Sequence, residues 1–115
     1  MTAEENLPIT IENSDGTTVL KPSGDVDLSG APELRARIAE VFSDPPARLV
    51  IDLSEVPYMD SSGVATLVEG MQLANQAGAT LVLAGMQDRV KSIFEIARLD
   101  TVFKIAEDLT AAKEL

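Results

Sequence analysis

Two short, largely apolar runs on either side of an amphipathic segment constrain the fold of this chain more than any other feature. Leu49–Leu53 and Thr80–Ala84 are each typical of a strand buried within a parallel sheet. Between them, Ser61–Ala77 repeats apolar side chains at helical spacing and is followed by Gly78, a favourable helix stop. A helix between two buried strands favours an α/β architecture.

The segments before and after this unit continue the alternation of strands and helices. Isoleucines that alternate with polar residues, followed by a turn signal, predict a hairpin over residues 9–20. A helix is predicted to begin at Ser29 or Gly30, with Ser29 as its N-cap. The remaining predicted elements are a helix over about 90–97, a strand over 102–105 and a helical stretch over 107–115. The sequence therefore predicts a single α/β domain over 1–115, with a mixed sheet of four to five strands, about four helices and a flexible tail over 1–6.

Histidine and cysteine are both missing from the chain. Their absence removes the usual general base, the thiolate nucleophile and the best ligands for zinc, copper and iron. Carboxylate sites for magnesium or calcium stay possible on composition. We expect no cofactor, no metal and no catalytic residue.

The chain carries a net charge of −10, from 19 acidic and 9 basic side chains. A field of this sign repels phosphate backbones and anionic lipid surfaces. With one Tyr, three Phe and no Trp, few side chains can stack on bases. Nucleic acid is therefore an unfavourable partner and a basic protein surface a better one, although solubility alone also accounts for the charge.

The hydropathy pattern gives no sign of membrane insertion. No apolar run reaches the roughly 18 residues that span a bilayer, and the acidic N-terminus lacks the basic and then apolar order of a secretory signal. We expect a soluble, cytoplasmic protein.

The polar run Asp60-Ser61-Ser62-Gly63 lies between a predicted buried strand and the strongest predicted helix. The Ser61 hydroxyl is expected at the positive end of that helix, where capping the helix is an equally weighted explanation. A second polar run, Gly24 to Ser29, follows the second strand. Loops after the carboxyl ends of parallel strands share one edge of a sheet, so Asp27 and Asp60 are expected near Ser61. A solvated acidic loop is the alternative for the second run.

An enzyme is disfavoured at this cluster. A serine nucleophile needs an adjacent base, and no histidine exists to supply one. The four lysines are dispersed, and the chain has no nucleophile elbow, phosphate-binding loop or dinucleotide fingerprint.

Three segments in order resemble one known family. The run from Leu49 to Val64, with Asp60-Ser61-Ser62-Gly63 near its end, resembles the signature of STAS domains, which are named for sulfate transporters and anti-sigma factor antagonists. Gly24-Asp25-Val26-Asp27 is similar to the family's upstream marker, and Arg98-Leu99-Asp100 with Val102-Phe103 resembles its C-terminal segment. The resemblance covers about Ile9 to Ala112 and implies the STAS fold. Without transmembrane segments, it points to the antagonist branch.

This resemblance implies a function that the residues alone do not supply. Antagonists bind an anti-sigma factor, often a serine kinase, and so free a sigma factor for transcription. The kinase phosphorylates the serine directly after the aspartate, which is Ser61 here, and a phosphatase restores the binding form. Asp27 and Asp60 match the carboxylates that flank that serine, while Ser62 and Gly63 complete the motif, with Gly63 keeping the helix start accessible.

A second reading within the family is a subunit of an ABC-type lipid transporter, docked on the permease or the ATPase. The stretch Ser62–Gly70 resembles helices of those proteins too. The family often has a Leu-Gly pair where this chain has Val64-Ala65, so Ala65 is a possible mark of a different partner class.

Overall fold

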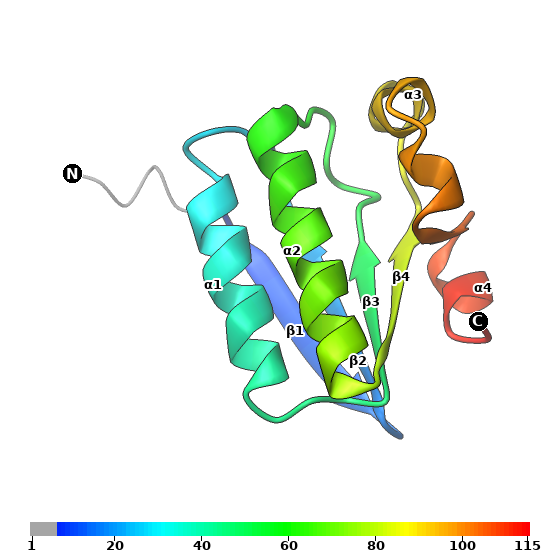
Figure 1. Ribbon diagram of the computed structural model, residues 1–115. Helices are drawn as coiled ribbons and strands as arrows, with labels where there is room; N and C mark the ends of the chain where they lie inside the picture. Colours follow the sequence, from blue (N-terminus) through cyan, green and yellow to red (C-terminus); the bar gives the residue numbers. More distant parts are fainter. Residues whose placement is uncertain (1–6) are drawn as a thin grey trace.

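A mixed β-sheet runs through the centre of the computed structural model, which describes residues 7–115 (Figure 1). Over these residues the sheet has five strands in the order β1-β2-β3-β4-β5. β1 pairs with β2 in antiparallel fashion, and the remaining neighbours are parallel. The strands are β1 (Ile9–Ser14), β2 (Thr17–Pro22), β3 (Arg48–Asp52), β4 (Thr80–Ala84) and β5 (Lys104–Ala106). The predicted mixed α/β sheet is confirmed; the expected tail over 1–6 lies outside the described residues.

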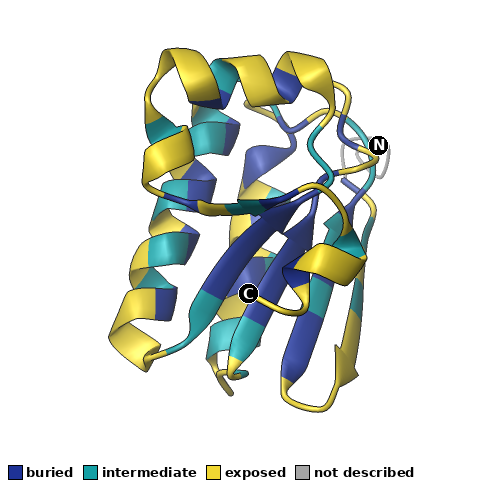
Figure 2. Cartoon of the chain, turned by 90° about the vertical axis from the view of Figure 1, so that its right-hand side faces the viewer, coloured by how far each residue is buried: buried dark blue, intermediate teal, exposed yellow. Residues whose placement is uncertain are grey.

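The two longest helices cover one face of the sheet, side by side (Figure 1). The helices are α1 (Ala31–Phe42), α2 (Ser61–Ala77), α3 (Asp88–Ile96), the 3-10 helix η2 (Leu99–Thr101) and α4 (Leu109–Ala112). α1, α2 and α3 share the larger apolar core, whereas Val50, Val82 and Ala112 belong to a smaller cluster around α4. Figure 2 shows the sheet from the side of β4 and α4, with buried strand residues in dark blue. No helix within residues 7–115 is both long enough and apolar enough to cross a membrane.

The N-terminal hairpin has the two-residue turn that its sequence requires. Asp15 and Gly16 have φ values of 54° and 81°. Positive φ at both central positions defines a type I′ turn, whose twist matches that of the strands, and Asp-Gly is among its preferred pairs. The predicted hairpin is confirmed.

Small residues bring α2 close to its neighbours. Its buried positions include Gly63, Thr66, Gly70 and Ala74. A Cβ atom on Gly70 would lie 3.4 Å from a methyl carbon of Ile38 on α1, so this glycine permits close contact between the helices. α2 is thereby fixed against α1 and the sheet, which holds its N-terminal end in place.

The C-terminal quarter differs from the prediction in three details. The last strand begins at Lys104, because Phe103 and Val102 donate backbone hydrogen bonds to the carbonyl of Leu99 and close the η2 turn first. The predicted helix over 107–115 is only the short α4, capped at its start by the Asp108 carboxylate. Ala97, predicted on the buried face of the third helix, is exposed because α3 ends at Ile96.

Candidate functional site

Two loops leave the carboxyl ends of β2 and β3 and are joined by a parallel bridge between Val26 and Met59. The Val26 N–H donates to the Tyr58 carbonyl at 3.0 Å, and the Asp60 N–H donates to the Val26 carbonyl at 3.2 Å. Val26 and Met59 are both buried in the core, so the backbone positions that follow them are fixed. Asp27 and Asp60 come directly after these two anchors. The structure thus places the two predicted carboxylates in adjacent loops at one edge of the sheet.

Asp60 caps α2. One oxygen of its carboxylate accepts the backbone N–H of Ser62 at 2.9 Å, the Ser62 hydroxyl at 2.6 Å and the N–H of Gly63 at 3.4 Å. The alternative explanation that Ser61 serves as the cap is therefore wrong. Ser61 is the first residue of α2, and its side chain is exposed.

Asp27 makes the same set of hydrogen bonds in the turn ahead of α1, although the N-cap of α1 itself is Gly30. The Asp27 carboxylate accepts the N–H of Ser29 at 3.0 Å, the Ser29 hydroxyl at 2.9 Å and the N–H of Gly30 at 3.1 Å. The prediction of Ser29 as N-cap is wrong, because α1 begins one residue later, after Gly30, and the Ser29 hydroxyl acts as a donor to Asp27. Asp27 is thus an ordered part of the turn and not merely a solvated acidic residue.

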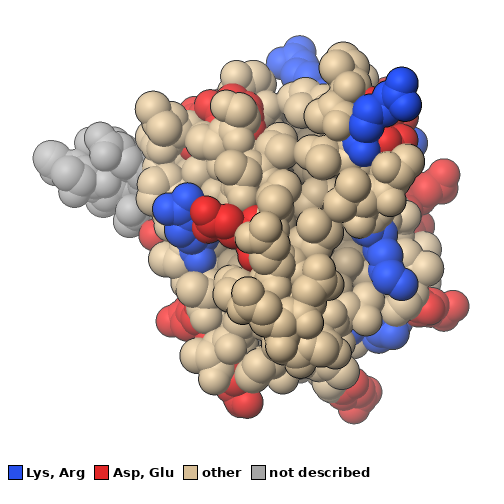
Figure 3. All heavy atoms as spheres, viewed as in Figure 1, with Lys and Arg blue, Asp and Glu red and all other residues tan. Residues whose placement is uncertain are grey.

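These donors favour the ionised form of both carboxylates. The hydrogen bond from the Ser29 hydroxyl, followed by that from the Gly30 N–H, lowers the pKa of Asp27 below its ordinary value. The Ser62 hydroxyl is the main cause that lowers the pKa of Asp60, with backbone N–H groups, including that of Leu28, adding smaller effects. The ion pairs among residues 7–115 involve neither aspartate. Figure 3 shows acidic atoms near the upper end of α2.

Gly63 is needed for close packing, not for an open turn. A Cβ atom at this position would lie 2.6 Å from Met59 Cγ and 2.6 Å from the Val26 carbonyl oxygen. We expected Gly63 to keep the helix start accessible, but its role in the structure is to permit close packing. The absence of a side chain lets the start of α2 lie directly against the Val26–Met59 bridge.

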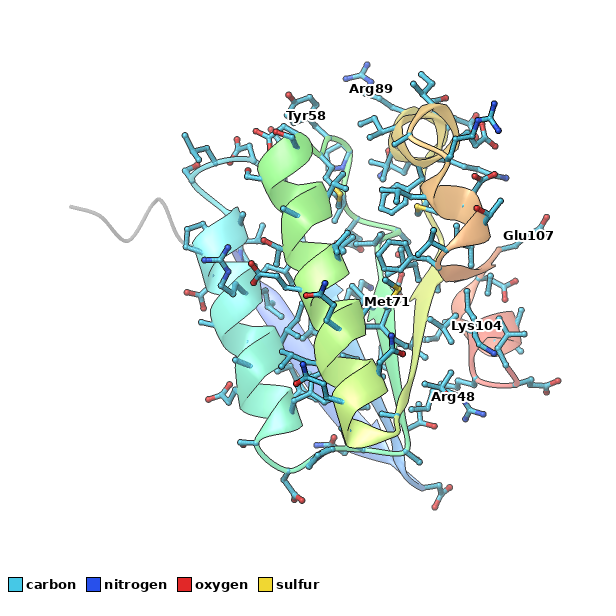
Figure 4. The ribbon with its side chains drawn as sticks, viewed as in Figure 1. Arg48, Tyr58, Met71, Arg89, Lys104 and Glu107 are labelled. Atoms are coloured by element: carbon cyan, nitrogen blue, oxygen red, sulfur yellow. The ribbon has the colours of Figure 1, made fainter. Side chains whose placement is uncertain are left out.

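Two exposed apolar side chains flank the site. Tyr58 is 40% exposed, and Figure 4 shows it at the N-terminal end of α2. Leu28 is 77% exposed and lies between Asp27 and Ser29. The signal that could have identified Leu28 is the repeated pattern Asp-x-Ser-Gly, which occurs at 27–30 and again at 60–63.

The arrangement is suited to binding. Within residues 7–115 no group of three or more His, Cys, Asp or Glu side chains could hold a metal ion. The site combines an exposed hydroxyl, two ionised carboxylates and two exposed apolar side chains on a rigid edge. Such a surface can dock a protein, and its hydroxyl is accessible to a modifying enzyme.

Comparison with known proteins agrees with this picture. The model of the STAS domain family matches residues 8–112, and the chain belongs to this family. The anti-sigma-B factor antagonist of Listeria monocytogenes is 32% identical over 101 residues, which cover 87% of this chain and 89% of that protein. The corresponding Staphylococcus aureus protein (strain NCTC 8325 / PS 47) is 29% identical over 102 residues, covering 89% of this chain and 94% of that protein. Neither relative is named as an enzyme.

Solved structures share the fold over nearly the full length. An anti-sigma factor antagonist from Mycobacterium paratuberculosis superposes with a TM-score of 0.88 at 26% identity, covering 99% of this chain and 97% of that one. Two further structures have lower sequence identity, and their similarity to this chain concerns only the fold. The Bacillus cell fate determinant SpoIIAA in its phosphorylated form has a TM-score of 0.72 at 18% identity, covering 93% of this chain and 98% of that one. A sulfate transporter family protein from Wolinella succinogenes has a TM-score of 0.74 at 17% identity, covering 88% and 84%.

Proposed function

We propose that this chain is an anti-sigma factor antagonist, a binding module that sequesters an anti-sigma factor and so frees a sigma factor for transcription. The observation that carries the proposal is the exposed Ser61 hydroxyl at the first position of α2, between the ionised Asp60 and the neighbouring turn of Asp27. The names of the Listeria and Staphylococcus relatives support the same role. In this proposal the chain itself catalyses nothing and acts in the cytoplasm as a single domain over 1–115.

The partner is an anti-sigma factor that is also a serine kinase, and Ser61 is its phosphorylation site. Ser61 is accessible to a kinase because its side chain is exposed and makes no part of the cap. A phosphatase would restore the hydroxyl. Asp27, Asp60, Ser62 and Gly63 are the remaining residues of the proposed docking site; the first three shape the charged edge, and Gly63 sets its position.

Phosphorylation would change the charge of the docking surface more than its shape. A phosphoserine adds about −1.5 to −2 charge. The N–H groups of Ser62 and Gly63 at the start of α2 already bind Asp60, so they are not free to accept the phosphate. The phosphate would therefore stand beside an ionised carboxylate, and covering both with a partner becomes costly. A loss of about 3 kcal/mol weakens binding by about two orders of magnitude.

The test is an affinity capture from the native host with three forms of the chain: wild type, Ser61→Ala and Ser61→Asp. We expect wild type and Ser61→Ala to recover an ATP-binding serine kinase, and Ser61→Asp to lose it. Ser92→Asp is the matched control, since it adds the same charge at an exposed serine on α3. Phosphorylation of wild type by the recovered kinase, and none of Ser61→Ala, would assign the site.

A different set of captured proteins would contradict the proposal. Recovery of a transporter permease or ATPase, with equal yield from Ser61→Ala and Ser61→Asp, would favour the lipid-transporter reading instead. Ala65 is exposed on α2 near the site and would then lie within the docking surface. Equal loss of the kinase with Ser61→Asp and Ser92→Asp would show that net charge, not position 61, controls binding.

A further inference from the structure

The two turns that precede α1 and α2 share a sequence pattern and a set of hydrogen bonds. Residues 26–30 read Val-Asp-Leu-Ser-Gly, and residues 59–63 read Met-Asp-Ser-Ser-Gly. In each turn a single aspartate oxygen accepts three hydrogen bonds, from the hydroxyl and N–H of the serine two residues on and from the N–H of the glycine three residues on. The first residues of the two turns, Val26 and Met59, are bridged to each other. The turns therefore lie side by side in matching register.

Leu28 occupies in the first turn the position that Ser61 occupies in the second. The turn uses the aspartate, the serine and the glycine, so this position is free to carry any side chain. Leu28 is nevertheless a large apolar residue that is 77% exposed and belongs to neither apolar core cluster of the described residues. Neither the turn nor the core accounts for a leucine at this position.

The surroundings of Leu28 indicate what kind of molecule could cover it. Asp27 precedes it, and its own backbone N–H is among the groups that lower the pKa of the Asp60 carboxyl. Neither aspartate is engaged in an ion pair with a Lys or Arg of residues 7–115. Anionic lipid and nucleic acid are repelled by such a pair of carboxylates. A protein surface with an apolar pocket and a basic rim is complementary to it.

We propose that Leu28 is the apolar anchor of the surface that contains Ser61, inserted into an apolar pocket of the protein partner between Lys or Arg side chains that face Asp27 and Asp60. This inference rests on the proposed function for the identity of that partner as an anti-sigma factor. The equivalent positions of the two turns then have different roles. Leu28 contributes binding affinity whether or not Ser61 is phosphorylated, and phosphorylation of Ser61 prevents docking. Since burying a leucine side chain is worth a few kilocalories per mole, its truncation should weaken binding about tenfold to a hundredfold.

The experiment first identifies what lies against residue 28 in the full chain. Leu28→p-benzoylphenylalanine and Ile96→p-benzoylphenylalanine are photo-crosslinked in the native host, and the protein captured through residue 28 is purified. Its affinity is then measured by calorimetry for wild type, Leu28→Ala and Ile96→Ala at two NaCl concentrations. Ile96 is the matched control because it is 83% exposed and lies on α3, outside both turns. Equal thermal midpoints for the three chains establish that the fold is unchanged.

The expected result is capture through residue 28, affinity about tenfold to a hundredfold lower for Leu28→Ala, and a change below about twofold for Ile96→Ala. Binding of wild type should also weaken as NaCl rises, because the basic rim is screened. Wild-type affinity for Leu28→Ala, or no capture through residue 28, would overturn the inference. If the captured protein is not an anti-sigma factor, the proposed function fails, while the affinities still decide whether Leu28 is the anchor.

Discussion

Replacing Gly63 with alanine tests whether the close approach at the start of α2 holds the two turns together. The added Cβ would lie 2.6 Å from Met59 Cγ, 2.6 Å from the Val26 carbonyl oxygen and 2.9 Å from Val26 Cγ1. Met59 can shift, but the carbonyl oxygen is backbone and accepts the Asp60 N–H. The strain therefore cannot be relieved by a side-chain rotation alone, and the start of α2 has to move away from the bridge.

The magnitude follows from two opposed effects. Overpacking a well-ordered site costs about 1–3 kcal/mol, and a clash with backbone places Gly63→Ala at about 3 kcal/mol. Alanine gains about 1 kcal/mol over glycine within a helix. The net expectation is a loss of about 2 kcal/mol in the free energy of unfolding. For a chain of 115 residues this lowers the thermal midpoint by about 8–10 °C.

Urea denaturation followed by circular dichroism measures this change, and Gly70→Ala is the matched control. Gly70 is also buried on α2, yet its added Cβ would lie 3.4 Å or more from the nearest atoms of Ile38 and Leu81. Gly70→Ala should therefore be neutral or stabilising by up to about 1 kcal/mol. If Gly63→Ala is as stable as Gly70→Ala, the proposed packing role of Gly63 is wrong.

Three further predictions concern the charged turns. Asp60→Ala should lower the free energy of unfolding by about 1 kcal/mol through loss of the α2 cap, whereas Ser61→Ala should leave it unchanged in the same urea titration. The folded-state pKa values of Asp27 and Asp60 lie below their ordinary value of 3.8. The stability that the two ionised carboxylates contribute is therefore present above pH 3.8 and is lost as the pH falls through their folded-state pKa values. In the double variant Asp27→Asn, Asp60→Asn, the free energy of unfolding should depend less steeply on pH in this acid range. Ser61→Asp should weaken binding of the purified anti-sigma factor about a hundredfold in calorimetry, while its thermal midpoint stays within about 3 °C of wild type.

The central elements β3, α2 and β4 could be predicted because their sequence patterns each fit only one type of secondary structure. The runs 49–53 and 80–84 are largely apolar, and the helix between them ends at Gly78, which adopts a φ of 71°. These boundaries match β3, β4 and α2 to within a residue. The family was also predictable, since the run from Leu49 to Val64, which resembles its signature, begins in β3 and ends in the first turn of α2.

The two misplaced helix caps depend on hydrogen bonds that a linear pattern does not reveal. Ser29 is a favourable N-cap residue by type, but the N–H of Ala31 that it would accept donates to the Asp27 carbonyl instead, and Pro32 has no N–H to offer. In the same way Asp60, not Ser61, caps α2. Serine and aspartate are both good caps, so the sequence alone could not rank them; their separation from the buried anchors Val26 and Met59 decided the outcome.

The resulting geometry separates the groups that hold the turns from the groups that face the solvent. In the second turn, Asp60, Ser62 and Gly63 are engaged in the cap or in packing, while Ser61 projects outward between them. A modification at Ser61 can therefore alter the charge of the surface without breaking any bond of the cap. The same division in the first turn leaves Leu28 free to contact a partner without disturbing Asp27. Under the proposed function, phosphorylation of Ser61 would therefore control binding without a change of fold, because only the surface that the partner must cover would differ.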